Sequence, residues 1–281
     1  MKLIYIIGLE HSGTTLTDHL LSQHPGVMGL GEVAEFFDAA HMKEYERKWG
    51  TYADAKLCSC GSSWEQCDFW SKSVDLCGDR NPRTIGEKYI TFCDRIRRDY
   101  GDEITIVDSS KRLDHLQFIG SNLSQLKLNA SDISVVFCCK DVRSFAASIC
   151  AKTRASGFVS TLRTFNWWLG FNRKVYQYLE TSGVRYTLSL YENMCRSPEA
   201  QIRRMIETAG LSSESVAGAD LKHTRSHIAL GNKNFTMRNR ERIAYDGRWF
   251  TNDTINAAYM LHVRVRAFNR RLYQIADAGQ K

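Results

Sequence analysis

The chain has 281 residues, of which 43% are hydrophobic, enough to bury the core of one large domain over residues 1–281. Its 38 basic and 31 acidic residues leave a net charge of +7, which suits an anionic ligand but is too diffuse to require nucleic acid. No apolar run approaches the roughly 18 residues of a membrane span. The 9 cysteines, several of them in apolar runs, favour a reducing, cytoplasmic location.

The predicted elements alternate between strands and helices along most of the chain. Nearly continuous apolar runs predict buried strands at residues 2–9, 103–110, 132–141 and 184–192. Apolar stripes predict helices from Thr14 to near Pro25 and over 165–179, 198–209 and about 252–276. This alternation favours an α/β fold with a P-loop-like central parallel sheet and helices on both faces. Residues 36–100 break the rhythm and predict an inserted irregular lobe.

The segment GLEHSGTTL, residues 8–16, joins the first predicted strand to the first predicted helix. A glycine turn before a helix N-terminus forms an anion site, because the first backbone N–H groups lack partners and the helix dipole is positive there. Gly8 and Gly13 have the spacing of a nucleotide-triphosphate loop, but Thr14 stands where that loop has its lysine. Only Asp108 is a good candidate to hold the Mg²⁺ that a kinase needs. The loop therefore favours an anion with less charge on its reacting group.

Seven segments in order resemble sulfotransferases that use 3′-phosphoadenosine 5′-phosphosulfate (PAPS), especially their carbohydrate and tyrosylprotein branch. They run from residue 3 to about 249 and include HSGTTLTDHLLSQHPGVMGLGEV, DSSK, KDVRSFAASI, WWLGFNRK, RYTLSLYENMCRSPEAQIRRMIETAGL, HIALGNKNFTMRN and DGRW. The resemblance implies that a sulfuryl group passes from PAPS to an acceptor hydroxyl. The product is 3′,5′-ADP (PAP), and no metal is required.

The resemblance also implies which residues bind the 5′-phosphate and the transferred sulfuryl group: His11, Ser12, Gly13, Thr14 and Thr15. His11 departs from the family, which usually has Lys or Arg at this position. A histidine can donate a hydrogen bond to the bridging oxygen, but its charge depends on pH.

Four further donor-site residues and one catalytic lysine follow from the same resemblance. Lys111 lies just after a predicted strand, where open α/β sheets bind ligands, and is the implied catalytic lysine. Arg143 and Ser148 match the 3′-phosphate residues, and a guanidinium can form two hydrogen bonds to phosphate. Arg238 would add a third donor. Tyr191, at a strand end, is placed against adenine, although an ordinary strand-end tyrosine is an equal interpretation.

A general base must take the proton of the acceptor hydroxyl. Glu32 resembles the catalytic glutamate of the tyrosylprotein branch, with Glu35 as its competitor and His41 as a weaker one. The neighbouring Phe36 and Phe37 could raise the pKa of a carboxyl group toward a useful range. The acceptor is expected to be a small molecule or glycan, with a carbohydrate or glycolipid hydroxyl preferred by analogy and a tyrosine left open.

The segment CSCGSSWEQCDFW contains Cys58, Cys60 and Cys67, and Cys77 follows. Zinc sites prefer pairs of the form C-x₂₋₄-C, whereas C-x-C is tighter and the next pair is wider. Free thiols that pack the lobe are therefore favoured over a disulfide or a metal, and no metal ligand is predicted.

Two other functions are compatible with parts of the sequence. A P-loop small-molecule kinase with a degenerate loop would need Mg²⁺ and a triphosphate. A basic nucleic-acid-binding protein would use the arginines of the last predicted helix, but these are scattered around an apolar stripe and fit a solvated helix face better.

Overall fold

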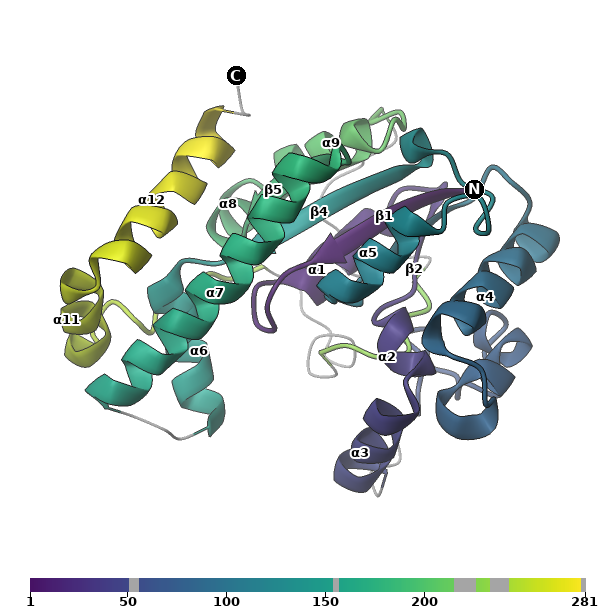
Figure 1. Cartoon of the computed structure of the whole chain (residues 1–281), viewed down its shortest axis with the longest axis horizontal. Helices are drawn as coiled ribbons and strands as arrows, with labels where there is room; N and C mark the ends of the chain where they lie inside the picture. The colour runs from purple at the N-terminus through teal and green to yellow at the C-terminus, as the bar shows by residue number, and fades with distance from the viewer. Residues whose placement is uncertain (51–55, 154–156, 215–225, 233–242, 279–281) are drawn as a thin grey trace.

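The computed structural model describes residues 1–50, 56–153, 157–214, 226–232 and 243–278. Five parallel strands form one sheet in the order β2-β3-β1-β4-β5 (Figure 1). In that order the strands span Val27–Gly29, Thr105–Asp108, Lys2–Ile7, Ile133–Cys139 and Arg185–Leu190. In the central register, Ile4 of β1 lies between Val107 of β3 and Ser134 of β4. The predicted α/β class with a parallel sheet is confirmed.

All four predicted strands are present, each slightly shorter than expected. The edge strand β2 was not predicted, because its three residues, Val-Met-Gly, are too short to produce a recognisable apolar run. Its partner β3 is buried along its whole length, and this pairing supplies the backbone hydrogen bonds that β2 needs.

Helices cover both faces of the sheet because alternate strand residues point to opposite sides. On one face, Ile4 and Ile6 pack in a core shared with α1 (Thr14–Leu21) and α9 (Pro198–Thr208). On the other face, Leu3, Tyr5 and Ile7 share a core with several helices. These include α5 (Leu113–Ser121), α6 (Val142–Thr153), α7 (Phe158–Ser182) and α12 (Val263–Ala278).

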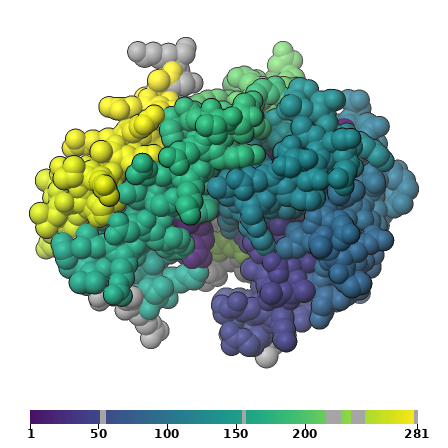
Figure 2. All heavy atoms as spheres, viewed as in Figure 1, coloured from purple at the N-terminus to yellow at the C-terminus, as the bar shows by residue number. Residues whose placement is uncertain are grey.

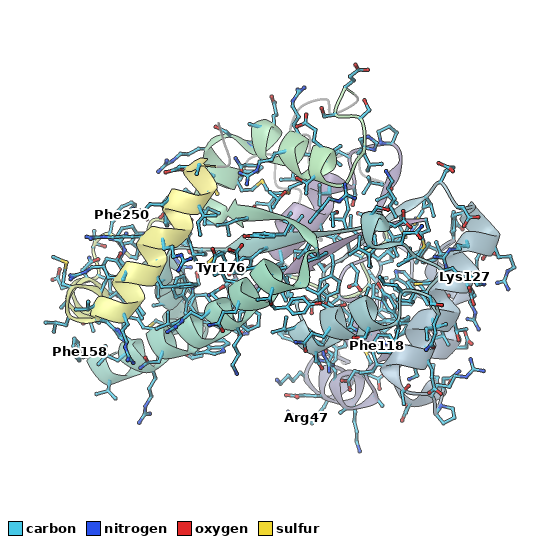
Figure 3. The ribbon with its side chains drawn as sticks, turned by 45° about the horizontal axis from the view of Figure 1, so that its top comes forward. Arg47, Phe118, Lys127, Phe158, Tyr176 and Phe250 are labelled. Carbon is cyan, nitrogen blue, oxygen red and sulfur yellow. The ribbon has the colours of Figure 1, made fainter. Side chains whose placement is uncertain are left out.

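The helix predicted over about 252–276 is in fact two helices, α11 (Asp253–Leu261) and α12. His262 separates them with non-helical φ and ψ angles of −92° and 79°. The break has a tertiary cause: α11 packs on α6 and α7, while α12 runs along α7 and β5. Figure 3 shows Tyr176 where α7 passes α12, and the Tyr176 hydroxyl accepts a hydrogen bond from Arg271 at 3.4 Å.

The C-terminal arginines lie on a helix whose other face is buried. On α12, Arg264 and Arg270 are exposed, whereas Val265 and Leu272 are buried. This is the solvated face of a core helix, as the sequence predicts. Among the helices that the structure describes, none combines the length and the apolar character needed to cross a bilayer.

The lobe predicted over 36–100 is more regular than expected. It contains α3 (Ala39–Trp49) and α4 (Ile85–Tyr100), and α2 (Val33–Phe37) leads into it. A capping box of Thr84 and Glu87 begins α4, which buries Tyr89, Phe92 and Ile96 at helical spacing. Between α3 and α4 the described chain forms turns and three short 3₁₀ helices, at Trp70–Lys72, Val74–Leu76 and Gly78–Arg80.

Candidate functional site

A cavity of about 1160 Å³ lies at the carboxyl ends of the strands. Its walls include Leu9 after β1, Lys111 after β3, Lys140 after β4 and Tyr191 after β5. Open α/β sheets bind their ligands at this edge. Side chains of α3, α6 and α7 and residues 230–232 also line the cavity, and Figure 2 shows the molecule hollowed between the α3 segment and the α6–α7 segment.

The glycine loop after β1 lies on the cavity wall. Gly13 precedes α1 with a left-handed φ of 87°, and an added Cβ would lie 3.1 Å from the Tyr191 ring. At Gly8, an added Cβ would lie 2.3 Å from the carbonyl oxygen of Cys138. Both positions therefore need glycine. Thr14 and Thr15 form the first turn of α1 and line the cavity, so the positive end of the helix faces it.

Two cavity residues have backbone conformations that side chains rarely adopt. His11 and Lys111 both have a φ of 65°. Such conformations cost free energy and persist where the surrounding structure enforces them, often at functional sites. Of the predicted loop residues, Ser12 is buried and is not among the residues that line the cavity, whereas His11 lines it.

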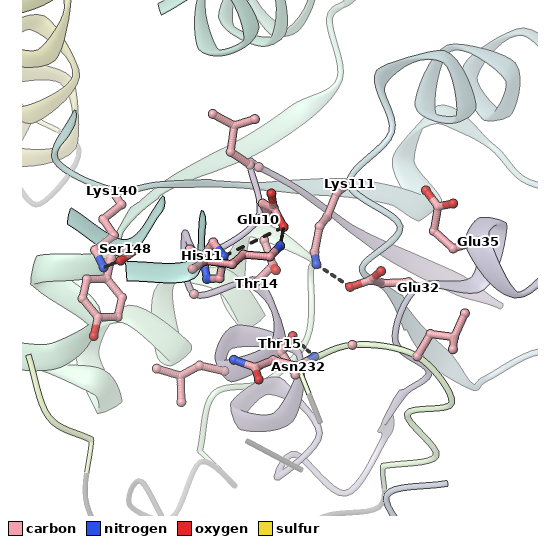
Figure 4. Close-up of a pocket in the computed structure, with 18 of the residues that line it drawn as sticks. Glu10, His11, Thr14, Thr15, Glu32, Glu35, Lys111, Lys140, Ser148 and Asn232 are labelled. Atoms are coloured by element: carbon pink, nitrogen blue, oxygen red, sulfur yellow. Dashed lines mark hydrogen bonds and ion pairs between the residues drawn. The ribbon is translucent and has the colours of Figure 1, made fainter. Parts of the chain in front are cut away.

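Glu32 and Lys111 form an ion pair within the cavity (Figure 4). The Glu32 side chain is 17% exposed and that of Lys111 is 20% exposed, so the pair is sheltered but accessible from the cavity. Glu32 precedes α2, and its backbone N–H donates to the carbonyl oxygen of Leu230 at 3.2 Å. The structure thus brings together the predicted base and the predicted catalytic lysine, which are far apart in the sequence.

A buried carboxyl group that the sequence analysis did not identify holds these loops to α1. Asp18 Oδ2 accepts hydrogen bonds from the Gly31 N–H at 3.0 Å and the Ser109 hydroxyl at 2.8 Å. Burial raises the pKa of Asp18 to about 7. Gly31 precedes Glu32, and Ser109 lies two residues before Lys111, so Asp18 fixes both catalytic candidates relative to the loop. An aspartate within the apolar first helix was the available signal.

The charge near the glycine loop comes from lysines rather than from His11. Burial lowers the pKa of His11, and Lys152, Lys140 and Lys111 lower it further, while Glu10 partly opposes this shift. His11 is therefore neutral near pH 7 and has one ring N–H to donate. Glu10 itself accepts a hydrogen bond from Lys152 at 2.6 Å.

Lys140 and Ser148 meet on the opposite side of the cavity from Glu32 (Figure 4). Lys140 Nζ donates to Ser148 Oγ at 3.1 Å and lies 4.5 Å from the centre of the Tyr191 ring. It also lies 3.6 Å from Asp246 Oδ2. Burial lowers the pKa of Lys140, whereas Asp246 acts in the opposite direction. A cation and a hydroxyl group side by side form a suitable site for a phosphate.

Arg143, the predicted partner of Ser148, does not line this cavity. Its guanidinium donates two hydrogen bonds of 2.9 Å to Asp141, and it lies 3.8 Å from the Trp249 ring centre and 4.5 Å from that of Tyr259. Lys140, three residues earlier, faces the cavity instead. Arg238 lies outside the described residues.

The far end of the cavity is built largely by α3 and carries the alternative bases. His41 Nδ1 lies 3.1 Å from Glu35 Oε2, and burial raises the pKa of Glu35. Tyr45 and Trp49 of α3 add aromatic surface to this end, and Phe171 of α7 adds aromatic surface elsewhere on the cavity wall.

The cysteines of the lobe lie outside the cavity. Cys58, Cys60 and Cys67 lie close to one another and to His227, which the sequence analysis did not consider. Cys77 is buried and does not belong to this group.

The comparison with known families agrees with this geometry. The sequence profile described as "Sulfotransferase family" matches residues 4–215, three quarters of the chain. The chain belongs to the sulfotransferase family. The family resemblance inferred from the sequence is therefore confirmed, whereas the carbohydrate or tyrosylprotein branch is not. No curated protein matches this sulfotransferase significantly in sequence.

One solved structure shares the fold of this sulfotransferase, and two others are similar to it more weakly. The sulfotransferase domain of the olefin synthase of Synechococcus PCC 7002 is 17% identical, with a TM-score of 0.59 over 92% of this chain and 93% of the other. A sulfotransferase of Alicyclobacillus acidocaldarius is 15% identical, with a TM-score of 0.45 over 95% of both chains. The sulfotransferase STF9 of Mycobacterium avium is 11% identical, with a TM-score of 0.41 over 87% of this chain and 78% of the other.

Proposed function

We propose that this sulfotransferase transfers a sulfuryl group from PAPS to an acceptor hydroxyl and releases PAP. One observation carries the proposal. The lysine-free glycine loop opens into a cavity that holds the Lys111–Glu32 pair on one side and the Lys140–Ser148 pair on the other (Figure 4). The loop suits the 5′-phosphosulfate, and the second pair suits a phosphate at the other end of the donor.

In this proposal the donor spans the cavity. Backbone N–H groups and hydroxyls at Gly13, Thr14 and Thr15 bind the 5′-phosphate and sulfuryl oxygens. Lys140 and Ser148 bind the 3′-phosphate, in place of the Arg143 predicted from sequence. The Tyr191 ring, which lies beside Gly13 and 4.5 Å from Lys140 Nζ, borders the adenosine.

The chemistry is an in-line displacement at sulfur. Glu32 accepts the proton of the acceptor hydroxyl as its oxygen forms a bond to sulfur, and the bond from sulfur to the bridging phosphate oxygen breaks. Lys111 shifts from Glu32 toward the sulfuryl oxygens, which frees the carboxylate as a base and neutralises the developing charge. Neutral His11 donates its N–H to the bridging oxygen, and the electron pair of the broken bond leaves with PAP.

The acceptor is proposed to be a hydroxyl of a carbohydrate or glycolipid. Tyr45 and Trp49 line the α3 end of the cavity, Phe171 of α7 also lies on the wall, and aromatic faces pack well against sugar rings. Glu35 and His41 add polar groups to the same end. A tyrosine acceptor uses the same aromatic surface and belongs in the same assay.

The carboxylate that the kinase alternative was expected to use for Mg²⁺ does not face the cavity. Asp108, the one strand-end carboxylate favoured by sequence, is fully buried and does not line the cavity. Its Oδ1 accepts hydrogen bonds from the N–H and hydroxyl of Ser110.

Calorimetry in EDTA tests the donor assignment. We expect PAP to bind without a divalent ion and ATP with Mg²⁺ to bind much more weakly. A strict Mg²⁺ requirement, or preference for ATP, would contradict the proposal. Transfer of radiolabelled sulfate from PAPS to a panel of glycans, glycolipids and tyrosine peptides then identifies the acceptor class.

A further inference from the structure

Four side chains of the kinds that bind metal ions lie together at the lobe of residues 36–100. Cys58, Cys60 and Cys67 come from one turn-rich segment, and His227 comes from segment 226–232, 160 residues beyond Cys67. One ligand atom of each residue lies within 4.8 Å of those of the others. None of the four lines the cavity, so the cluster is separate from the proposed transfer site.

The separations agree with four ligands around one tetrahedral zinc ion. Zn–S bonds of about 2.3 Å and Zn–N bonds of about 2.0–2.1 Å place two sulfurs about 3.8 Å apart, and a sulfur and a nitrogen about 3.5 Å apart. Cys60 Sγ lies 3.7 Å from Cys67 Sγ. His227 Nδ1 lies 3.2 Å from Cys67 Sγ and 3.8 Å from Cys58 Sγ.

Backbone hydrogen bonds shape the turn that presents the cysteines. The Cys58 N–H donates to Ser62 O at 2.9 Å, and the Gly61 N–H donates to Cys58 O at 2.9 Å. Gly61 has a left-handed φ of 91°, which glycine adopts without strain. The Cys67 N–H then donates to Ser63 O at 2.8 Å. The chain therefore folds back on itself, and the C-x-C spacing that argued against zinc still brings the sulfurs together.

His227 is held in place by contacts on both sides. Its ring stacks on Phe69, with centroids 5.4 Å apart and planes 19° apart, and its carbonyl oxygen accepts a hydrogen bond from Trp70 Nε1. The next residue, Ile228, exchanges two hydrogen bonds with Ser59, at 2.9 Å and 3.0 Å. Ser59 lies between Cys58 and Cys60, so the same contact aligns the histidine with the cysteine turn.

We propose that Cys58, Cys60, Cys67 and His227 bind one structural Zn²⁺ ion. Three thiolates and an imidazole complete a four-coordinate set, and structural zinc sites have no open position for a substrate. Thiolate and imidazole ligands in a tetrahedral arrangement suit zinc rather than magnesium or calcium. A disulfide would use two of the sulfurs and leave the third sulfur and the imidazole without a common partner.

The ion has a consequence for the cavity. Segment 226–232, held at His227, also lies on the cavity wall, where Leu230 O accepts from the Glu32 N–H at 3.2 Å. The Asn232 N–H donates to Thr15 Oγ1 at 3.2 Å. The zinc site therefore fixes one wall of the cavity from outside, without contact with the reactants.

Metal analysis of the full chain tests the proposal, after purification by a tag that does not use metal affinity. We expect one zinc per chain in the wild type, by elemental analysis and native mass spectrometry. The Cys67→Ser and His227→Ala variants should lose the zinc, whereas His227→Cys should retain it. Cys77→Ser is the matched control, since Cys77 is a buried cysteine of the same lobe outside the cluster, and it should retain the zinc.

Measurements on the wild type keep the test decisive where a variant does not fold. Titration of the thiols with a mercurial should release the zinc as three cysteines react. Replacement by Co²⁺ should give the visible bands of tetrahedral cobalt with thiolate ligands. A wild-type chain without zinc and without uptake of Co²⁺ overturns the proposal, as does a Cys67→Ser chain that retains one zinc. A disulfide among Cys58, Cys60 and Cys67 in the denatured wild type also overturns it.

Discussion

Segment 226–232 contacts both the cavity and the cysteine cluster, and the two sites are assembled in different ways. The cavity takes Leu9, Lys111, Lys140 and Tyr191 from positions just after four parallel strands. The parallel direction of the strands alone brings such positions to one edge of the sheet. The cluster instead needs a tight turn and a histidine delivered by a distant segment. The cavity is thus a product of topology, and the cluster is a product of loop packing.

The largest expected effect concerns the chemistry of the cavity. Glu32→Gln should lower turnover by about 10²–10⁴-fold, the range for loss of a positioned general base. PAP affinity should be almost unchanged, because glutamine keeps the size of the side chain. Steady-state kinetics and calorimetry separate the two quantities.

Glu35→Gln is the matched control, since Glu35 lines the same cavity and pairs with His41. We expect it to change turnover much less than Glu32→Gln. The acidic limb of the pH–rate profile should disappear in Glu32→Gln and persist in His11→Ala. A larger loss in Glu35→Gln would make Glu35 the base.

The next effect distinguishes Lys140, which the fold places on the cavity, from Arg143, which the sequence resemblance assigned to the 3′-phosphate. Lys140→Ala should weaken the binding of PAP by about 1.5–3 kcal/mol, which raises its dissociation constant roughly 10–150-fold. This is the range expected for a lost charge-assisted hydrogen bond. The same change should weaken the binding of AMP much less, because AMP lacks the 3′-phosphate. Arg143→Ala should have a small effect on both ligands, since its guanidinium is bound to Asp141. A selective loss of PAP binding in Arg143→Ala would restore the assignment made from sequence.

An effect that is smaller per pH unit concerns the carboxyl group of Asp18, which holds the cavity loops to α1. Burial raises the folded-state pKa of Asp18 to about 7 from 3.8, although the hydrogen bonds from Ser109 and Gly31 act in the opposite direction. The folded state therefore retains a proton that the unfolded chain loses, and stability should fall as pH rises from about 4 to 7. This contributes at most about 1.4 kcal/mol per pH unit.

Asp18→Asn should remove that contribution while keeping an acceptor for the Gly31 N–H and the Ser109 hydroxyl. Urea unfolding at several pH values measures the difference in slope between wild type and variant. An unchanged slope would show that Asp18 does not carry the raised pKa.

The smallest effect tests how the two sites are coupled. Loss of the proposed zinc ion in Cys67→Ser should weaken the binding of PAP by only about 0.5–1.5 kcal/mol. This is the net value of one hydrogen bond, here the one between the Asn232 N–H and Thr15. Calorimetry on Cys67→Ser and on the control Cys77→Ser measures this loss of affinity. A loss as large as that in Lys140→Ala would mean that the cluster is needed to form the cavity.

The regular elements near the sheet could be predicted because their signals are local. Apolar runs indicate β1, β3, β4 and β5, and two glycines before Thr14 indicate the anion loop. By contrast, the break at His262 depends on what the flanking helices contact, and an apolar stripe continues across it. The helix α4 has both a capping box and an apolar stripe, so its sequence also carries a local helix signal.

The sequence by itself determined three things: the unit of β1, glycine loop and α1, the family, and the positions of Lys111 and Tyr191 at strand ends. The first and third depend on short-range spacing, and the family depends on the order of the resembling segments along the chain. Only the tertiary structure showed that Lys140 faces the cavity while Asp141, Trp249 and Tyr259 hold Arg143, which is the basis for proposing Lys140 at the 3′-phosphate. Only the tertiary structure placed His227 beside the cysteines. Both findings depend on groups brought together by packing from distant parts of the chain, and spacing along the sequence carries no information about them.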